Sequence, residues 1–180
     1  MKRNYILKLT YSAACIALAM LLPLLTWQDA KLGNMFSLMH IPVILCGFLC
    51  GWEWGLPVGF ISPLLRSLIF GMPPIFPTAV AMAFELAAYG LIAGLLYKIF
   101  PKKNGFIYVT LVAAMVGGRI VGGAAQFIIA GIKSTTYTVG MFFTSYFANA
   151  IPGIVLHIIL IPLIVMALRN EKLIPNERKA

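Results

Sequence analysis

Long apolar blocks separated by short polar segments dominate the chain. The blocks cover about residues 5–26, 41–52, 56–71, 78–100, 106–132 and 145–168. A membrane-spanning helix needs roughly 20 apolar residues, whereas the strands of a membrane barrel alternate apolar and polar positions. The blocks are continuous, and only helices or closed barrels satisfy their backbone hydrogen bonds in lipid. The pattern predicts an all-α membrane protein: one domain, residues 1–180, folded as a six-transmembrane-helix bundle.

Two of the predicted helices are short. The blocks at 41–52 and 56–71 contain glycine and proline, so we expect them to tilt or to be covered at their ends by neighbouring protein. Between the third and fourth blocks, residues 71–77 hold three prolines, which cannot continue a helix. This segment is interpreted as a rigid loop. Residues 27–34 form a polar connection after the first helix.

Composition supports a lipid environment. The chain is 61% hydrophobic and 11% charged, whereas a soluble domain is typically about 45–50% apolar and about 25% charged. The three cysteines, Cys15, Cys46 and Cys50, lie inside apolar blocks. Their odd number and spacing favour neither a disulfide framework nor a metal site, and packing is the simplest role for them.

The net charge of +9 is distributed unevenly between the two expected membrane faces. The face that holds the amino terminus has ten cations: Lys2, Arg3, Lys8, Lys98, Lys102, Lys103, Arg169, Lys172, Arg178 and Lys179. The other face has two, Lys31 and Lys133. Because Lys and Arg are enriched in cytoplasmic loops, both termini are predicted to be cytoplasmic in a multi-pass protein of the plasma membrane. This distribution explains the charge without a nucleic-acid partner.

Ionisable groups inside apolar blocks are costly in a bilayer and are therefore candidates for function. Arg66 and Glu85 lie at similar depth on neighbouring antiparallel helices. They either form a buried ion pair or face a cavity that opens outward. In a cavity, an arginine at this position would bind a carboxylate or a phosphate through two parallel hydrogen bonds.

Arg119 lies in the middle of the fifth block among four glycines, Gly117, Gly118, Gly122 and Gly123. Glycines permit close helix packing and leave space beside the arginine. Gln126 is seven residues further on and so lies on the same face of the helix. Ligand contact and internal pairing are both open for Arg119.

In the sixth block, Asn149, Gly153 and His157 recur at every fourth residue and so form one stripe. Asn149 and Tyr146 lie nearer the outer end and are candidates for ligand binding. His157 is interpreted as a core histidine rather than the floor of a pocket. The predicted substrate-binding set is therefore Arg66, Glu85, Arg119, Gln126, Asn149 and Tyr146.

The chain carries no motif for catalysis. It has two histidines, His40 and His157, and lacks a Gly-x-Ser-x-Gly elbow, a His-Glu-x-x-His motif and a P-loop. We therefore predict no catalytic residue, no metal and no cofactor, and any ATP hydrolysis would take place in partner subunits. In the first block, Ala13 and Ala17 form a small-x-x-x-small pattern. This pattern suits either packing within the bundle or docking of another membrane subunit.

Several segments together resemble the substrate-binding S components of energy-coupling factor (ECF) transporters, which import vitamins. They are the Ala13-x-x-x-Ala17 pattern; Glu85-x-x-x-Tyr89-Gly90-x-x-x-Gly94; residues 55–66 with Gly59 and Pro63; and residues 150–154 followed by 160–162. The resemblance covers nearly the whole chain. One departure is His157, where the family would have a glutamine-like residue.

The resemblance implies a mechanism. An S component binds its vitamin tightly from outside in a pocket formed by the outer halves of helices four to six and capped by loops. It then associates with a transmembrane coupling (T) subunit and two ATPase subunits, and topples in the membrane to release the vitamin. Ala13 and Ala17 would contact the coupling subunit. The two arginines favour an anionic ligand such as pantothenate or folate, while aromatic residues keep riboflavin as a rival.

Three other classes of function stay open at this level. A stand-alone channel or secondary transporter would have inverted repeats with breaks in both halves, and the glycine and proline breaks lie in the first half only. An intramembrane enzyme would use Glu85 or His157. A purely structural membrane partner would have no affinity for small molecules.

Overall fold

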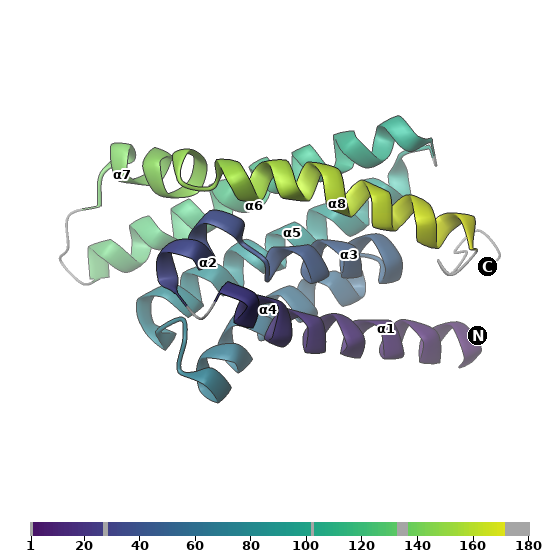
Figure 1. The fold of residues 1–180 in the computed structure, drawn as a ribbon, viewed down its shortest axis with the longest axis horizontal. Helices are drawn as coiled ribbons and strands as arrows, with labels where there is room; N and C mark the ends of the chain where they lie inside the picture. Colours follow the sequence, from purple (N-terminus) through teal and green to yellow (C-terminus); the bar gives the residue numbers. More distant parts are fainter. Residues whose placement is uncertain (1, 27–28, 102, 133–136, 172–180) are drawn as a thin grey trace.

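A computed structural model describes residues 2–26, 29–101, 103–132 and 137–171, which form a bundle of α-helices (Figure 1). The helices are α1 (Lys2–Leu21), α2 (Ala30–Phe36), α3 (His40–Cys50), α4 (Trp52–Phe70), α5 (Val80–Ile99), α6 (Asn104–Ile132), α7 (Val139–Phe143) and α8 (Ile151–Asn170). Short helical turns occupy Leu22–Thr26, Ile75–Ala79 and Thr144–Ala148. No strand occurs in these ranges. The all-α prediction is confirmed.

Four helical stretches are long and apolar enough to cross a membrane: Asn4–Thr26, Ile75–Ile99, Asn104–Ile132 and Ile151–Asn170. In contrast, α3 has 11 residues. Its length of about 17 Å is little more than half of the roughly 30 Å hydrocarbon layer. The short helix α2 lies beyond the amino-terminal end of α3 (Figure 1). The arrangement of the chain as six spans stays a prediction.

The first turn of α1 and the last turn of α8 lie at the same end of the bundle (Figure 1). At this end Arg169 of α8 donates a hydrogen bond to the side-chain oxygen of Asn104, the first residue of α6. Lys98 lies in the last turn of α5. Of the cations used to predict orientation, Lys102, Lys133, Lys172, Arg178 and Lys179 lie outside the described residues.

The centre of the bundle is built on direct backbone contact between α4 and α5. A Cβ atom added at Gly90 would lie 2.2 Å from the carbonyl oxygen of Gly55, and one at Gly59 would lie 2.3 Å from that of Leu86. Helix α3 joins the same contact, because a Cβ at Gly47 would lie 2.7 Å from the oxygen of Gly90. Apolar side chains, among them those of Val43, Ile44, Cys46, Leu86, Leu111 and Ile161, fill the remaining core.

One helix was missed by the sequence pattern. The connection predicted at residues 27–34 overlaps most of α2, although Trp27 and Gln28 lie outside the described residues. The side chain of Asp29 accepts a hydrogen bond from Leu32 N at 3.0 Å, as a helix-capping residue does. Helix α2 packs against α8 at Gly153, where a Cβ atom would lie 2.6 Å from the carbonyl oxygen of Met35.

The prediction for the sixth helix is also wrong at the amino-terminal end of that helix. Residues 145–168 do not form one helix, since α7 and the turn Thr144–Ala148 precede α8, which begins at Ile151. Pro152 lies in the first turn of α8. Proline is favoured there because its missing N–H would have no partner in any case, and it disfavours continuation from the preceding turn.

The segment between α4 and α5 ends one helix and starts the next. Helix α4 stops at Gly71, which has a positive φ of 71° that suits glycine. Ser67 Oγ donates to the carbonyl oxygen of Pro73 at 2.5 Å and so ties the proline-rich segment to α4. The segment lies at the opposite end of the bundle from the first turn of α1 (Figure 1).

Candidate functional site

A cavity of about 240 Å³ lies between α3, α5, α6 and the segment that precedes α8. Five of the six predicted substrate-binding residues line it: Glu85, Arg119, Gln126, Tyr146 and Asn149. Ser37, His40, Thr78, Met82 and Tyr137 are among the other lining residues. We call this the Arg119 cavity. The structure brings these residues together, and their contact with a ligand stays a prediction.

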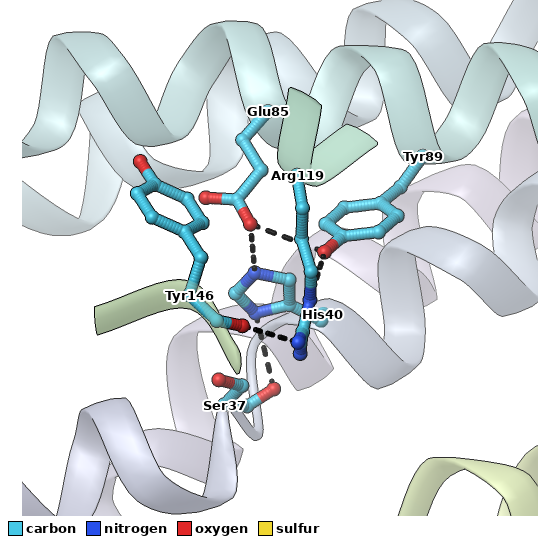
Figure 2. A network of polar contacts seen from close by, with 6 residues as sticks. All are labelled: Ser37, His40, Glu85, Tyr89, Arg119 and Tyr146. Carbon is cyan, nitrogen blue, oxygen red and sulfur yellow. Dashed lines mark hydrogen bonds and ion pairs between the residues drawn. The ribbon is translucent and has the colours of Figure 1, made fainter. Parts of the chain in front are cut away.

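Arg119 is only 4% exposed and is held by neutral groups. Its Nε donates to the phenol oxygen of Tyr89 at 3.2 Å, and Nη1 donates to the backbone oxygen of Tyr146 (Figure 2). The guanidinium carbon lies 5.4 Å from the centre of the Phe147 ring. The second amino group, Nη2, has no acceptor among the described residues, and it is not among the fully buried atoms that lack a partner. Arg119 therefore keeps donors for a group in the cavity.

Glu85 faces Arg119 across the phenol of Tyr89 rather than directly. Its Oε1 accepts a hydrogen bond from Tyr89 OH at 3.1 Å and lies 3.6 Å from His40 Nε2, an ion pair when His40 is protonated (Figure 2). His40 Nδ1 lies 3.1 Å from the backbone oxygen of Ser37. These contacts use one carboxylate oxygen and leave Oε2 without a donor among the described residues. The cavity thus offers both a guanidinium donor and a carboxylate acceptor.

The alternative in which Arg66 pairs with Glu85 is wrong. Arg66 Nη1 donates to the backbone oxygen of Met20 at 2.5 Å, and its guanidinium lies 5.1 Å from the centre of the Phe70 ring. It lines a second cavity of about 370 Å³ beside α1 and the proline-rich segment, which we call the Arg66 cavity. Although α4 and α5 are in close contact, the side chains of Arg66 and Glu85 line different cavities.

The remaining predicted residues form the outer part of the Arg119 cavity. Gln126 and Tyr146 are half-buried, and Asn149 is exposed. Tyr137, in the segment before α7, has a buried hydroxyl without a partner among the described residues. Burial, followed by the charge of Glu85, raises the pKa of Tyr137, so its phenol stays neutral and can donate.

His157 does not line the Arg119 cavity. It is 2% exposed, and its ring stacks on that of His40 with centroids 6.1 Å apart. Its Nε2 is buried without a hydrogen-bond partner among the described residues. This placement fits the interpretation of His157 as a core residue, one layer behind the site.

The glycines beside Arg119 do not leave open space. A Cβ atom at Gly118 would lie 2.8 Å from the Tyr89 ring, and one at Gly122 would lie 2.8 Å from Glu85 Cβ. At Gly123 it would lie 2.1 Å from the Phe142 ring. The glycine face of α6 is therefore filled by side chains, two of which belong to the polar network in Figure 2.

Three members of the network in Figure 2 were not predicted: Tyr89 and His40, which contribute side chains, and Ser37, which contributes a backbone oxygen. Tyr89 lies four residues after Glu85, hence on the same helix face. That spacing was a usable signal. His40 lies just before the second apolar block, where a polar residue is ordinary. It reaches the site because α3 is short and begins inside the bundle (Figure 1).

Ala13 and Ala17 are exposed, whereas Ser12, Cys15 and Ala19 of the same helix are buried. The small-x-x-x-small pattern therefore does not pack against other described parts of this chain. Its contact with a partner subunit stays a prediction. The described residues contain no group of three His, Cys, Asp or Glu side chains that could hold a metal ion.

Comparison with known proteins identifies the family of the chain. Comparison with curated proteins and with solved structures gives no match. Residues 7–168 match a family described as ECF transporter, substrate-specific component. The match covers most of the chain and confirms the resemblance based on its motifs. The chain belongs to the family of substrate-specific components of ECF transporters.

Proposed function

We propose that this protein is the high-affinity subunit of an ECF importer that binds a vitamin or a related micronutrient in the Arg119 cavity. Family membership supports a substrate-specific subunit. The observation that carries the location is the polar network itself, in which Arg119 and Glu85 each keep hydrogen-bonding capacity directed to one cavity. Buried polar groups are normally satisfied, so a bound ligand would complete this network.

The family also determines which step the chain performs. Its members are substrate-binding membrane subunits, and the ATPase activity lies with partner subunits. We propose that the partners are one transmembrane coupling subunit and two ATPase subunits. The exposed alanines Ala13 and Ala17 of α1 would contact the coupling subunit, because small residues allow a second helix to approach closely.

The proposed orientation places the protein in the plasma membrane with six spans and both termini in the cytoplasm. Support comes from the distribution of Lys and Arg and from the position of the first turn of α1 and the last turn of α8 at one end of the bundle (Figure 1). The Arg119 cavity lies toward the other end, next to α2 and α7. It would then open to the outside, where a vitamin arrives.

The site favours a ligand that presents an acceptor to Arg119 and a donor to Glu85. Pantothenate and folate each combine a carboxylate with N–H or O–H groups, so we propose an anionic vitamin of this kind. Riboflavin is the rival, because Tyr137 and Tyr146 line the same cavity and aromatic rings stack well on a flavin.

The test combines native mass spectrometry of the purified protein with a thermal-shift panel of water-soluble vitamins. We expect one vitamin to co-purify or to raise the melting temperature. Replacing Arg119 by Gln should weaken its binding by about 100-fold, since removal of a buried charged partner costs roughly 2–5 kcal/mol. Arg169→Gln is the matched control, because Arg169 lies at the opposite end of the bundle. A folded protein without affinity for any panel member would contradict the proposal.

A further inference from the structure

We propose that the ligand extends from the Arg119 cavity into the Arg66 cavity and ends there in an anionic group held by Arg66. This inference rests on the proposed function and adds the shape of the substrate and the position of its charge: an elongated molecule with a polar head in the Arg119 cavity and an anionic terminus at Arg66. The role assigned to the Arg66 cavity is to bind the anionic end of the ligand.

The first step is the unsatisfied charge of Arg66. Its side chain is 3% exposed within a helix that is expected to lie in the membrane. Of the five N–H groups of a guanidinium, the contacts with described residues use one, which donates to the backbone oxygen of Met20. Arginines this deep are normally paired, because an isolated buried charge is costly. An anion in the adjoining cavity would provide the missing partner.

No carboxylate in the described part of the chain provides that anion. Asp29 also lines the Arg66 cavity, but it is exposed and its Oδ1 accepts from Leu32 N at the start of α2. Among the described residues, no carboxylate lies within ion-pair distance of Arg66. Arg66 therefore differs from Arg119, which shares a network with Glu85.

The second step is that the two cavities are adjacent and share part of their walls. Ser37, His40, Thr78 and Met82 line both of them. Pockets for small molecules usually measure about 300–1,000 Å³, and the Arg119 cavity alone, at about 240 Å³, is below this range. The Arg66 cavity adds about 370 Å³. A vitamin of ordinary size would therefore occupy both.

The third step is the difference in lining. Near Arg66 the walls are largely apolar, with contributions from Leu38, Met39, Met72, Pro73 and Pro74. Near Arg119 the walls carry Glu85, Gln126 and Asn149. A matching ligand has a hydrogen-bonding head, a less polar middle and a charged end.

A purely structural role for Arg66 is the competing explanation. Met20 lies in the last turn of α1, and an arginine at a helix carboxyl end stabilises the terminal carbonyl groups. In that case Arg66 would affect folding without affecting the choice of ligand. The test must therefore read out selectivity rather than binding alone.

The experiment uses the purified full-length protein and pairs of compounds that differ in the terminal carboxylate: pantothenate and panthenol, biotin and biotinamide, lipoate and lipoamide. Dissociation constants are measured for each pair with the native protein, Arg66→Gln and Arg66→Lys. We expect one carboxylate to bind at least tenfold more tightly than its neutral partner, since a hydrogen bond between two charged groups is stronger than one between a charged and a neutral group. Arg66→Gln should abolish the ratio, and Arg66→Lys should restore part of it.

Each outcome bears on the inference separately from the proposed function. Binding of a vitamin with no preference for the carboxylate, or a preference that survives Arg66→Gln, overturns the inference and leaves the function intact. A lower melting temperature of ligand-free Arg66→Gln with an unchanged ratio assigns Arg66 to the capping of α1. A native mass spectrum that shows a ligand without an anionic group also overturns the inference. Absence of all small-molecule binding would remove both proposals.

Discussion

Two sets of glycines divide the bundle into regions with different tasks. In the first region, Gly55 and Gly59 of α4 meet α5 backbone to backbone, and a Cβ at Gly90 would lie 2.2 Å from the oxygen of Gly55. In the second region, Gly118 and Gly122 of α6 face side chains of α5, namely those of Tyr89 and Glu85. Glycine therefore has two different effects. Between α4 and α5 it allows direct contact of the two backbones, and between α5 and α6 it makes room for the side chains of a polar network.

The difference shows how a small membrane protein can build a site. Helix α5 presents one face to α4 and another to α6, so the backbone contact fixes the helix that carries Glu85 and Tyr89. Backbone atoms cannot move aside as the ends of side chains can. We therefore expect substitutions in the first region to affect folding, and substitutions in the second to affect the ligand.

The largest effect is expected for Gly90→Ala. The new methyl group would overlap the carbonyl of Gly55, and neither backbone can yield without separating α4 from α5. We expect a loss of about 3 kcal/mol or more, at the upper end of the usual cost of overpacking. Thermal denaturation followed by size-exclusion chromatography measures it. Gly105→Ala is the control, because nothing lies within 4 Å of a Cβ there. Equal stability of the two variants would contradict the backbone contact.

The long helices of the fold could be predicted because their signal lies in the local sequence. Continuous apolar blocks with interior glycines specify long helices in lipid, and five of the six predicted blocks match the helices closely. The two errors, α2 and the division before α8, lie toward the end of the bundle that is opposite the first turn of α1 (Figure 1). There a helix of seven residues depends on packing, such as that of Gly153 against α2, which no local pattern reveals.

The candidate site was predictable for a different reason. Polar groups inside apolar blocks are few, so naming Glu85, Arg119 and Gln126 required only their depth. The direction of a side chain is not encoded in depth, which is why the prediction left open whether Arg66 pairs with Glu85. His40 escaped notice because its role depends on where α3 begins, and that is a property of the assembled bundle.

An intermediate effect is expected for Gly122→Ala. The added methyl group would lie 2.8 Å from Glu85 Cβ and 3.1 Å from its carboxyl carbon, so Glu85 must shift by a few tenths of an ångström. We expect about 1 kcal/mol of lost stability and about tenfold weaker ligand binding, because displacement removes one good hydrogen bond. Dissociation constants and melting temperatures measured together separate the two effects. Gly131→Ala on the same helix, where a Cβ meets open space, is the control.

Gly122→Ala also tests whether the α4–α5 and α5–α6 contacts differ in rigidity. If Gly122→Ala unfolded the protein as completely as Gly90→Ala, the α5–α6 contact would be as rigid as the α4–α5 contact. The distinction between a rigid α4–α5 contact and an adaptable site between α5 and α6 would then be wrong. If binding were unchanged, Glu85 would not be a ligand contact.

The smallest effect is expected for Tyr89→Phe. The hydroxyl of Tyr89 accepts from Arg119 Nε at 3.2 Å and donates to Glu85 Oε1 at 3.1 Å, so among the described residues it is the one hydrogen-bonded link between the two charged groups. Removal of the hydroxyl preserves the ring, which packs against Gly118. Because both charged groups border the cavity, water or ligand can replace the hydroxyl. We therefore expect a loss of stability of about 1 kcal/mol and roughly threefold weaker binding.

Tyr97→Phe on the same helix is the matched control for Tyr89→Phe. Tyr97 is buried and packs edge-on against Phe48, away from the cavity linings that contain Arg119 and Arg66. Whatever the effect of Tyr97→Phe on stability, we expect its affinity for the ligand to equal that of the native protein. A threefold change of affinity in Tyr89→Phe alone would show that the phenol positions Arg119 and Glu85 for the ligand. An equal change in both variants would instead trace the effect to the general packing of α5.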